Sequence, residues 1–248
     1  MKTTGNTVLI TGGTSGIGKG FAEELVQRGN TVIICGRRED RLQEIQSSFP
    51  QIVTTMCDLS VVEEREALFQ WSVETFPELN MLINNAGIQL PCDMTREVDI
   101  VKVNQEIELN LTAPIHLASL FAEHFTRSNE AAIINISSGL AFVPIAFMAV
   151  YCATKAAIHS ITMSLRHQLK NTSVRVFEIV PPSVDTELGH QRRADNSQSH
   201  GGMPVQKFID DAMSAIERDE YEAVVGHAVN LREKGEELFE QLNERRRE

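Results

Sequence analysis

The feature that most constrains the fold of this chain is a series of short apolar runs, each followed by an amphipathic segment. The runs are too short for helices and rich in β-branched residues, which is typical of strands buried on both faces of a sheet. Amphipathic segments between such strands predict helical crossovers that join parallel neighbours. The sequence therefore predicts an α/β fold with a single doubly wound, mostly parallel sheet and helices on both faces. About seven strands are expected, over residues 7–10, 31–34, 52–56, 81–83, 131–136, 174–180 and 222–225.

A single domain over residues 1–248 is expected, because no stretch rich in proline, glycine and serine divides the chain. The segment of about 185–202 is polar and shows no clear period, so we interpret it as a substrate loop over the functional site. After this loop the pattern predicts a helix, a strand and a final charged helix over about 228–247.

The net charge and the cysteine spacing limit the binding partners and the metal or disulfide sites expected of this chain. The formal net charge is −11, and the one basic cluster lies among glutamates at residues 245–247. Nucleic-acid binding requires a concentrated basic face, so no nucleic-acid partner is expected. No apolar stretch approaches the roughly 18 residues that span a bilayer, which predicts no membrane association and a cytoplasmic location. The four cysteines are widely spaced, so neither a metal site nor a disulfide framework is expected.

A glycine-rich turn follows the first predicted strand, at residues 11–18. Gly12, Gly16 and Gly18 allow the backbone to turn tightly and to approach a pyrophosphate closely. The helix that follows offers N–H groups and the positive end of its dipole. The pattern indicates a dinucleotide site, with a structural turn that binds no ligand as the alternative.

The same turn also fits the beginning of a phosphate-binding loop for ATP or GTP, because residues 13–19 read GxxxxGK. Gly20 stands where that loop needs a Ser or Thr hydroxyl for magnesium. No acidic residue stands out as a metal partner at the end of a later strand. A nucleotidase is therefore disfavoured.

Tyr151 and Lys155 are one helical turn apart if residues 150–170 form a helix, so their side chains share one face. An ammonium group near a phenol stabilises the phenolate and lowers the phenol pKa from its usual value of about 10. Tyr151 is then able to give or take the proton of an alcohol as a general acid/base.

Four motifs occur in a fixed order: TGxxxGIG at residues 11–18, NNAG at residues 84–87, Ser138, and YxxxK at residues 151–155. In this order, over most of its length, the chain resembles the short-chain dehydrogenase/reductase family. The resemblance implies a Rossmann-like fold and an oxidoreductase that exchanges a hydride between NAD(P)(H) and a small-molecule carbonyl or secondary alcohol. A catalytically silent NADP(H)-binding sensor or regulatory protein of the same fold is the alternative.

The resemblance assigns catalytic roles to four residues. Tyr151 is implied to be the acid/base, and Lys155 to tune it and to bond the nicotinamide ribose. Ser138 matches the serine that holds the substrate oxygen, whereas its neighbour Ser137 would point to the opposite face of the strand. Asn110 matches the asparagine that holds a water in a proton relay with the lysine.

Pro114 adds a physical argument for Asn110. Within a helix, a proline cannot donate a hydrogen bond to the carbonyl four residues earlier, which here belongs to Asn110. That carbonyl would be free to bind the relay water, and a plain helix kink is the alternative.

Other family positions surround the expected cofactor. Asp58 matches an aspartate that hydrogen-bonds the adenine ring, although Asp58 or Ser60 could instead cap the next helix. The family usually has Pro-Gly after the sixth strand, whereas Pro182 here follows Pro181, so the backbone path past the nicotinamide can differ. The resemblance implies the cofactor-binding residues Gly12, Thr14, Ser15, Gly16, Ile17, Gly18, Arg37, Arg38, Asp58, Leu59, Asn85, Ala86, Gly87, Tyr151, Lys155, Pro181, Val184 and Thr186.

The end of the second predicted strand bears on the choice of cofactor. Gly36 stands where an NAD-specific site usually has a carboxylate, and Arg37 and Arg38 follow it. A guanidinium makes charge-assisted bonds to a phosphate, so NADP(H) is preferred and NAD(H) remains possible. As an alternative, both arginines are solvated residues at the start of a helix.

The apolar surfaces of two predicted helices indicate that the chain forms an oligomer. Residues 117–122 and 156–165 are apolar or small on nearly every face, whereas a helix that covers one side of a monomer's sheet should show a polar stripe. The family commonly pairs subunits through these helices, so a homodimer or homotetramer is expected.

The apolar residues of 142–148 suggest a pocket wall, although they could equally belong to the core.

Overall fold

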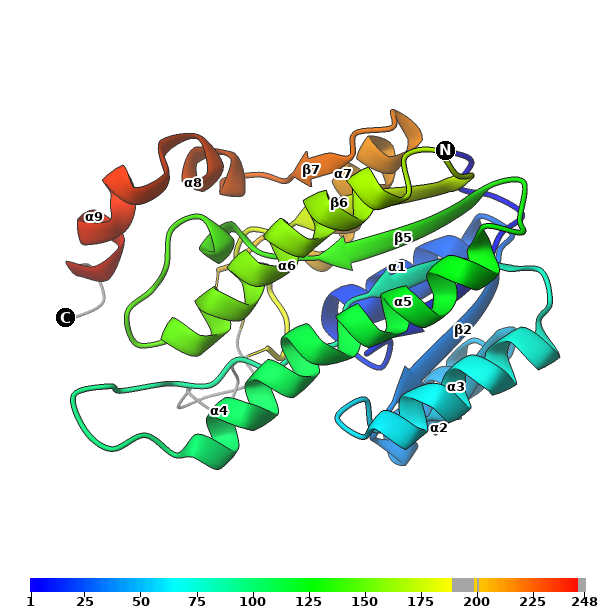
Figure 1. The fold of residues 1–248 in the computed structure, drawn as a ribbon, viewed down its shortest axis with the longest axis horizontal. Helices are drawn as coiled ribbons and strands as arrows, with labels where there is room; N and C mark the ends of the chain where they lie inside the picture. Colours follow the sequence, from blue (N-terminus) through cyan, green and yellow to red (C-terminus); the bar gives the residue numbers. More distant parts are fainter. Residues whose placement is uncertain (189–198, 200, 245–248) are drawn as a thin grey trace.

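A computed structural model describes residues 1–188, 199 and 201–244 of the chain (Figure 1). Its centre is one seven-stranded sheet in which every neighbouring pair of strands is parallel, in the order β3-β2-β1-β4-β5-β6-β7. The predicted doubly wound sheet is therefore confirmed. The strands are β1 Thr7–Thr11, β2 Thr31–Gly36, β3 Ile52–Met56, β4 Leu79–Asn84, β5 Ala131–Ile136, β6 Val174–Val180 and β7 Glu222–Val224.

Helices cover both faces of the sheet. One face packs against α1, α2 and α7, and the other against α3, α5 and α6, which face the viewer in Figure 1. The α-helices are α1 Gly16–Gln27, α2 Glu39–Ser48, α3 Val62–Thr75, α4 Ile100–Ile107, α5 Ala113–Phe125, α6 Ala149–Gln168, α7 Val205–Glu217, α8 Ala228–Lys234 and α9 Phe239–Glu244. Among the described residues, no helix is long and apolar enough to cross a membrane.

Strand periodicity explains the two layers of core. In β1, Val8 and Ile10 join the cluster under α1 and α7, while Leu9 between them joins the cluster under α3 and α5. All three side chains are fully buried. Alternate residues of a strand point to opposite faces, so a continuous apolar run is required when both faces are covered.

The strand order creates the place where a ligand can bind. The chain runs from β1 outward to β2 and β3 and then returns to place β4 on the other side of β1. In open α/β sheets, ligands bind outside the carboxyl ends of the strands at such a reversal. The glycine turn after β1 and the Asn84–Gly87 segment after β4 both lie at this edge.

The sequence predicts one charged helix over about 228–247. The described part of this region is helical but interrupted. A 3-10 turn at Gly235–Leu238 separates α8 from α9, and Gly235 has a φ of 54°. Glycine adopts this left-handed conformation without the steric cost that a side chain imposes, which allows the change of helix type there. Residues 245–248 lie outside the described part, as do 189–198 and 200 of the predicted substrate loop.

Candidate active site

The turns after β1 and β4 are fastened to each other by Thr11. Its Oγ1 accepts hydrogen bonds from the backbone N–H groups of Asn85 (2.9 Å) and Ala86 (3.1 Å). In return, Asn85 Nδ2 donates to the carbonyls of Thr11 (3.0 Å) and Gly12 (3.2 Å). These hydrogen bonds fasten the two turns to each other at the switch point of the sheet.

Two glycines of the turn are required by close backbone packing. Gly12 has a φ of 64°, and a Cβ there would lie 2.9 Å from the Cα of Ala86. A Cβ on Gly18 would lie 2.4 Å from both Asn85 Nδ2 and the Gly12 carbonyl oxygen. Any side chain at either position would push the two turns apart.

The N-terminus of α1 faces the same edge. Gly16 opens the helix with a φ of 53°, and Ser15, the N-cap residue, makes no capping hydrogen bond with its side chain. Helix N-terminal N–H groups attract anions, so this end is suited to a pyrophosphate. A Cβ on Gly16 would lie 3.1 Å from Thr186, which places the segment after β6 over the turn.

The two arginines after β2 lie in different surroundings. Arg38 Nη2 donates to Thr14 Oγ1 (3.3 Å) and Ser15 Oγ (3.1 Å) in the glycine turn, and its Nη1 bonds Glu187 (3.2 Å). Arg37 Nη1 lies 3.9 Å from Asp58 Oδ2. Both guanidinium groups thus stand at the carboxyl edge of β2, where the sequence placed a phosphate contact.

Asp58 is held as a carboxylate at the end of β3. Partial burial opposes its ionisation, but two hydrogen bonds from Ser60 and the charge of Arg37 outweigh burial and keep its pKa below the usual value. The residue that caps α3 is Val61, so neither Asp58 nor Ser60 occupies the N-cap position. Leu59 is buried beside it, and its carbonyl accepts a hydrogen bond from Arg65 (2.7 Å).

Tyr151 and Lys155 lie in the first two turns of α6, and both side chains are buried. The Lys155 Nζ atom is 5.8 Å from the centre of the Tyr151 ring and donates to the carbonyl of Ile136 at 2.8 Å. Burial lowers the pKa of Lys155 from 10.5 to about 8. An ammonium group held in a low-dielectric site acts strongly on a neighbouring phenol, because little water screens it.

Asn110 lies in a π-helical turn at Glu108–Thr112, between α4 and α5. Its side chain exchanges two hydrogen bonds of 2.8 Å with the backbone N–H and carbonyl of Ile88 after β4. A Cβ on Gly87 would lie 3.1 Å from Asn110 Oδ1 and 3.9 Å from Lys155 Nζ. Asn110, Gly87 and Lys155 therefore converge at the switch point.

The π-turn refines the expectation based on Pro114. Pro114 falls in the first turn of α5, and the N–H of Ala113 bonds the carbonyl of Glu108, five residues earlier. Since Pro114 has no N–H, the α-helical bond to the Asn110 carbonyl cannot form. The sequence predicted a local irregularity here but gave no signal for its type.

The two serines after β5 make different hydrogen bonds. Ser137 is buried, and its N–H and hydroxyl both bond the carbonyl of Ile179 in β6, at 3.0 and 3.5 Å. Ser138 lies past the strand, where its Oγ accepts the N–H of Leu140 (3.1 Å) and caps a 3-10 turn that packs against α6. Ser138 is therefore the serine that is joined to the turn beside α6.

The segment after β6 keeps a defined path despite Pro182. The carbonyl of Pro181 accepts the N–H of Gly139 (3.0 Å) next to Ser138. Val184 forms a parallel bridge with Met203, so the base of the predicted substrate loop is closed by backbone pairing. The expected nicotinamide contacts therefore lie between the glycine turn and the serine.

Comparisons with known proteins agree with this architecture. The short chain dehydrogenase family profile matches residues 6–197. An uncharacterised oxidoreductase of Bacillus subtilis strain 168, DltE, is 46% identical over 248 residues, which covers 98% of each chain. The chain belongs to the short-chain dehydrogenase/reductase family of oxidoreductases.

Two solved structures show the same fold with different cofactors. A short-chain dehydrogenase from Sphingobium yanoikuyae in complex with NADPH superimposes with a TM-score of 0.80 at 28% identity, covering 88% of this chain and 87% of the other. A family member from Burkholderia phymatum in complex with NAD gives a TM-score of 0.83 at 20% identity, covering 94% and 93%. The second supports the fold alone.

Proposed function

We propose that this chain exchanges a hydride between NADP(H) and a carbonyl or secondary alcohol, with Tyr151 as general acid/base. The observation that carries the proposal is the convergence of Lys155 and Asn110 beside Tyr151 at the switch point of the sheet. Family membership supports it. A nicotinamide cofactor fits this edge, because the glycine turn excludes side chains where a pyrophosphate would approach and α1 presents its N-terminus there.

The nicotinamide would supply or accept the hydride when bound, and the side chains manage the proton. In reduction, the Tyr151 hydroxyl gives its proton to the substrate oxygen, which the Ser138 hydroxyl holds by a hydrogen bond. The ammonium group of Lys155 stabilises the phenolate left behind. The Asn110 carbonyl, without its α-helical partner, is placed to hold a water that returns a proton. In oxidation each transfer runs in reverse.

The experiment that tests the function is an absorbance assay of NADPH oxidation and NADP reduction over panels of carbonyl compounds and alcohols. Turnover of at least one class is expected, and the preferred substrate then serves for every variant below. A protein that binds NADPH tightly but turns over no panel member would favour the silent sensor.

Arg37→Asp is expected to weaken NADPH binding by roughly ten- to a hundredfold while leaving NADH binding nearly unchanged. A charge-assisted bond worth about 1.5–3 kcal/mol would be replaced by repulsion of the 2′-phosphate. Fluorescence titration with both cofactors measures the effect. Arg127→Asp, at an exposed position in the turn after α5, is a matched control that should alter neither affinity.

Equal affinity of the unaltered protein for NADH and NADPH would contradict the assignment of Arg37. Arg38→Ala separates the two arginines, since Arg38 also holds the hydroxyls of the glycine turn. Its loss is therefore expected to weaken both cofactors, whereas Arg37 should act on NADPH alone.

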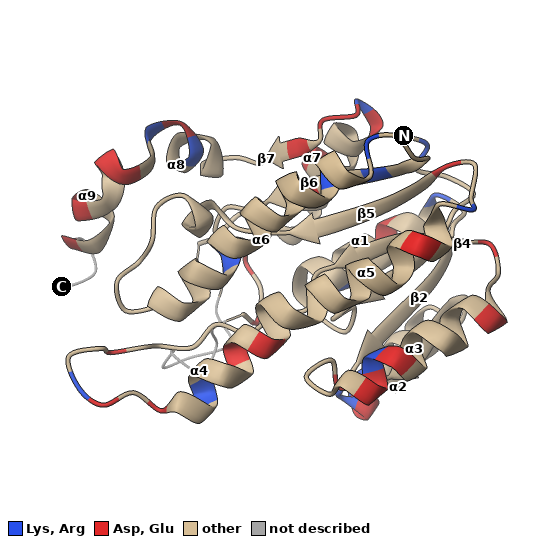
Figure 2. Cartoon of the chain, viewed as in Figure 1, with Lys and Arg blue, Asp and Glu red and all other residues tan. Residues whose placement is uncertain are grey.

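We also propose that the chain pairs through α5 and α6, whose middle parts carry few charges in the view of Figure 2. Met163 is 52% exposed and Ile115 is 40% exposed on these helices. Exposed apolar side chains on neighbouring helices are typical of a subunit contact. Light scattering coupled to gel filtration should give a dimer or tetramer, and Met163→Lys should shift it toward the monomer. A stable monomer of 27.6 kDa at micromolar concentration would refute this contact.

A further inference from the structure

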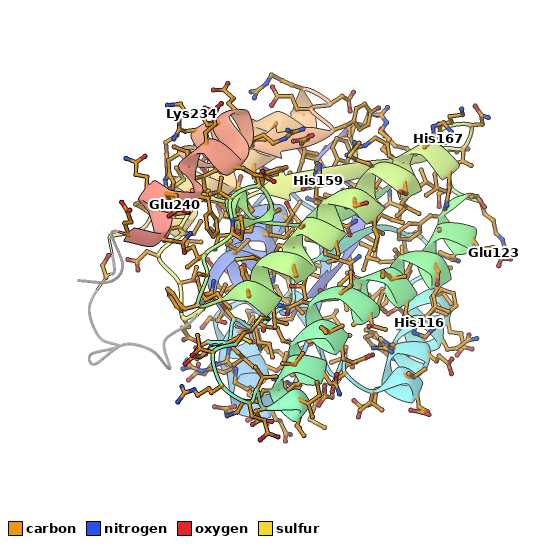
Figure 3. All side chains as sticks on the ribbon, turned by 60° about the vertical axis from the view of Figure 1, so that its left-hand side comes forward. His116, Glu123, His159, His167, Lys234 and Glu240 are labelled. Carbon is orange, nitrogen blue, oxygen red and sulfur yellow. The ribbon has the colours of Figure 1, made fainter. Side chains whose placement is uncertain are left out.

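A second cluster of ionisable side chains lies where α6 meets β6 and β7. It consists of His159 of α6, Glu178 of β6 and Glu222 of β7, each of which offers one ligand atom within 4.8 Å of the others. His159 lies midway along α6 (Figure 3). Its Nδ1 is 2.8 Å from Glu178 Oε2. None of these residues takes part in the mechanism above.

Glu178 is the unusual member of this cluster. Its side chain is 0% exposed, and Oε1 has no hydrogen-bond partner among the described residues. Glu178 and Glu222 are also direct neighbours in the ladder between β6 and β7. A buried carboxylate with one unsatisfied oxygen is costly, and a second carboxylate beside it adds repulsion. Glu178 Oε1 therefore has lone pairs that no hydrogen bond in the cluster uses and that are available to a cation.

Two arginines lie near the cluster, but neither donates a hydrogen bond to Glu178 Oε1. Arg232 of α8 bonds Glu222, with Nε 2.5 Å from Oε1, and its guanidinium lies 4.7 Å from the centre of the Phe142 ring. Arg166 donates to the carbonyls of Val176 and Tyr221. Their charges compensate the carboxylates in part, while Glu178 Oε1 receives no donor from either.

Glu222 is held ready to act as a ligand. Its two carboxylate oxygens accept hydrogen bonds from Arg232 Nε (2.5 Å) and Nη2 (3.5 Å). Ligating carboxylates in metal sites are commonly fixed by such outer hydrogen bonds. The side chains of His159 and Glu222 are 18% and 26% exposed, so an ion could reach the cluster from solvent.

We propose that His159, Glu178 and Glu222 bind one divalent transition-metal ion, with water completing its coordination. One imidazole nitrogen and two carboxylate oxygens suit Zn²⁺, whereas Mg²⁺ and Ca²⁺ prefer oxygen donors alone. On binding, His159 Nδ1 exchanges its contact with Glu178 for the metal. The ion would fasten β7 to the helix that carries Tyr151 and Lys155, and its role is structural.

Zn²⁺ titration of tag-free, chelator-treated protein by calorimetry tests this site. Binding of one ion per chain is expected, with a rise in melting temperature that EDTA reverses. The four cysteines are buried, and burial raises the pKa of Cys57 to about 12, which limits competition from thiols. Co²⁺ provides a second readout, because its visible absorption reports coordination by protein ligands.

Glu178→Gln keeps the shape of the side chain and is expected to lower Zn²⁺ affinity by at least about tenfold, as is His159→Gln. Matched controls are Glu123→Gln and His167→Gln on the exposed faces of α5 and α6, which should bind as the unaltered protein does (Figure 3). If Glu178→Gln fails to fold, the partly exposed His159 decides the question.

Two results would overturn the proposal. One is the absence of saturable Zn²⁺ binding tighter than about 1 mM in the unaltered protein. The other is binding that neither Glu178→Gln nor His159→Gln weakens, which would assign the ion to another place on the chain. NADPH affinity, measured on the same samples, reports independently on the cofactor site.

Discussion

Replacing Tyr151 with phenylalanine is expected to lower turnover by about 10²–10⁴-fold, the usual contribution of a positioned general acid/base. The change removes only the hydroxyl that transfers the proton. The ring stays in the small apolar cluster with Ile145, Met148 and Cys152, so the fold should be retained. The steady-state rate with the preferred substrate and the NADPH dissociation constant, both measured near neutral pH, separate chemistry from cofactor binding.

The chain provides its own control, because it contains only one other tyrosine. Tyr221 lies beside β7 and stacks on Phe177 with ring centres 5.2 Å apart. Tyr221→Phe should keep the rate of the unaltered protein. A Tyr151→Phe protein with a near-normal rate would remove Tyr151 from the reaction, whereas one that no longer bound NADPH would point to damage at the cofactor site.

The fold was predictable because its signals are local. The apolar run at β1 alone requires a strand covered on both faces, and the glycines after it require a turn too tight for side chains. The i, i+4 spacing of Tyr151 and Lys155 placed them on one face of a helix, as α6 shows. Each of these inferences needs only residues a few positions apart.

Features that depend on distant pairing left no such signal. Arg65 looks like a solvated helix residue in the sequence, yet it is buried and bonds the Leu59 carbonyl (2.7 Å) and Glu108 (2.6 Å), the first residue of the π-turn. Thr11 fastens the turns after β1 and β4 to each other, and nothing in its sequence position beyond its place before Gly12 predicts this role.

The sequence gives no signal for the cluster of His159, Glu178 and Glu222, for the same reason. His159 and Glu178 are 19 residues apart in sequence and meet only because α6 crosses back over β6. Short ligand spacings reveal sites built on one helix or loop. A site assembled from α6, β6 and β7 becomes visible only in the fold.

Lys155 is expected to have opposite effects on stability and on catalysis. Burial lowers its pKa from 10.5 to about 8. Below pH 8 the lysine is charged in both the folded and the unfolded chain, so the folded state bears the full cost of the buried charge. Between pH 8 and 10.5 the folded chain releases the proton first, and stability rises with pH. The shift corresponds to about 3 kcal/mol.

Lys155→Met is expected to remove this pH-dependent part of the unfolding free energy. The unfolding free energy of the unaltered protein minus that of the variant should rise by about 3 kcal/mol between pH 7 and 10.5, measured by denaturant titration without cofactor. Groups remote from Lys155 titrate equally in both chains and cancel in this difference. Repeating the comparison in a Tyr151→Phe background removes the phenol whose titration Lys155 shifts. The lost bond to the Ile136 carbonyl lowers the variant's stability by about 1 kcal/mol at every pH. Lys170→Met, on an exposed lysine past α6, should show no such rise.

The same substitution should lower turnover by about 10²–10³-fold, the range for removing one preorganised donor from a reaction centre. If Lys155→Met is inactive and its unfolding free energy has lost this pH dependence, the buried charge of Lys155 both destabilises the fold and is required for the reaction at Tyr151. A stability difference that stays flat from pH 7 to 10.5 would mean that Lys155 is hydrated in solution. Retained turnover would exclude Lys155 from the proton transfer, since a methionine cannot stabilise a phenolate.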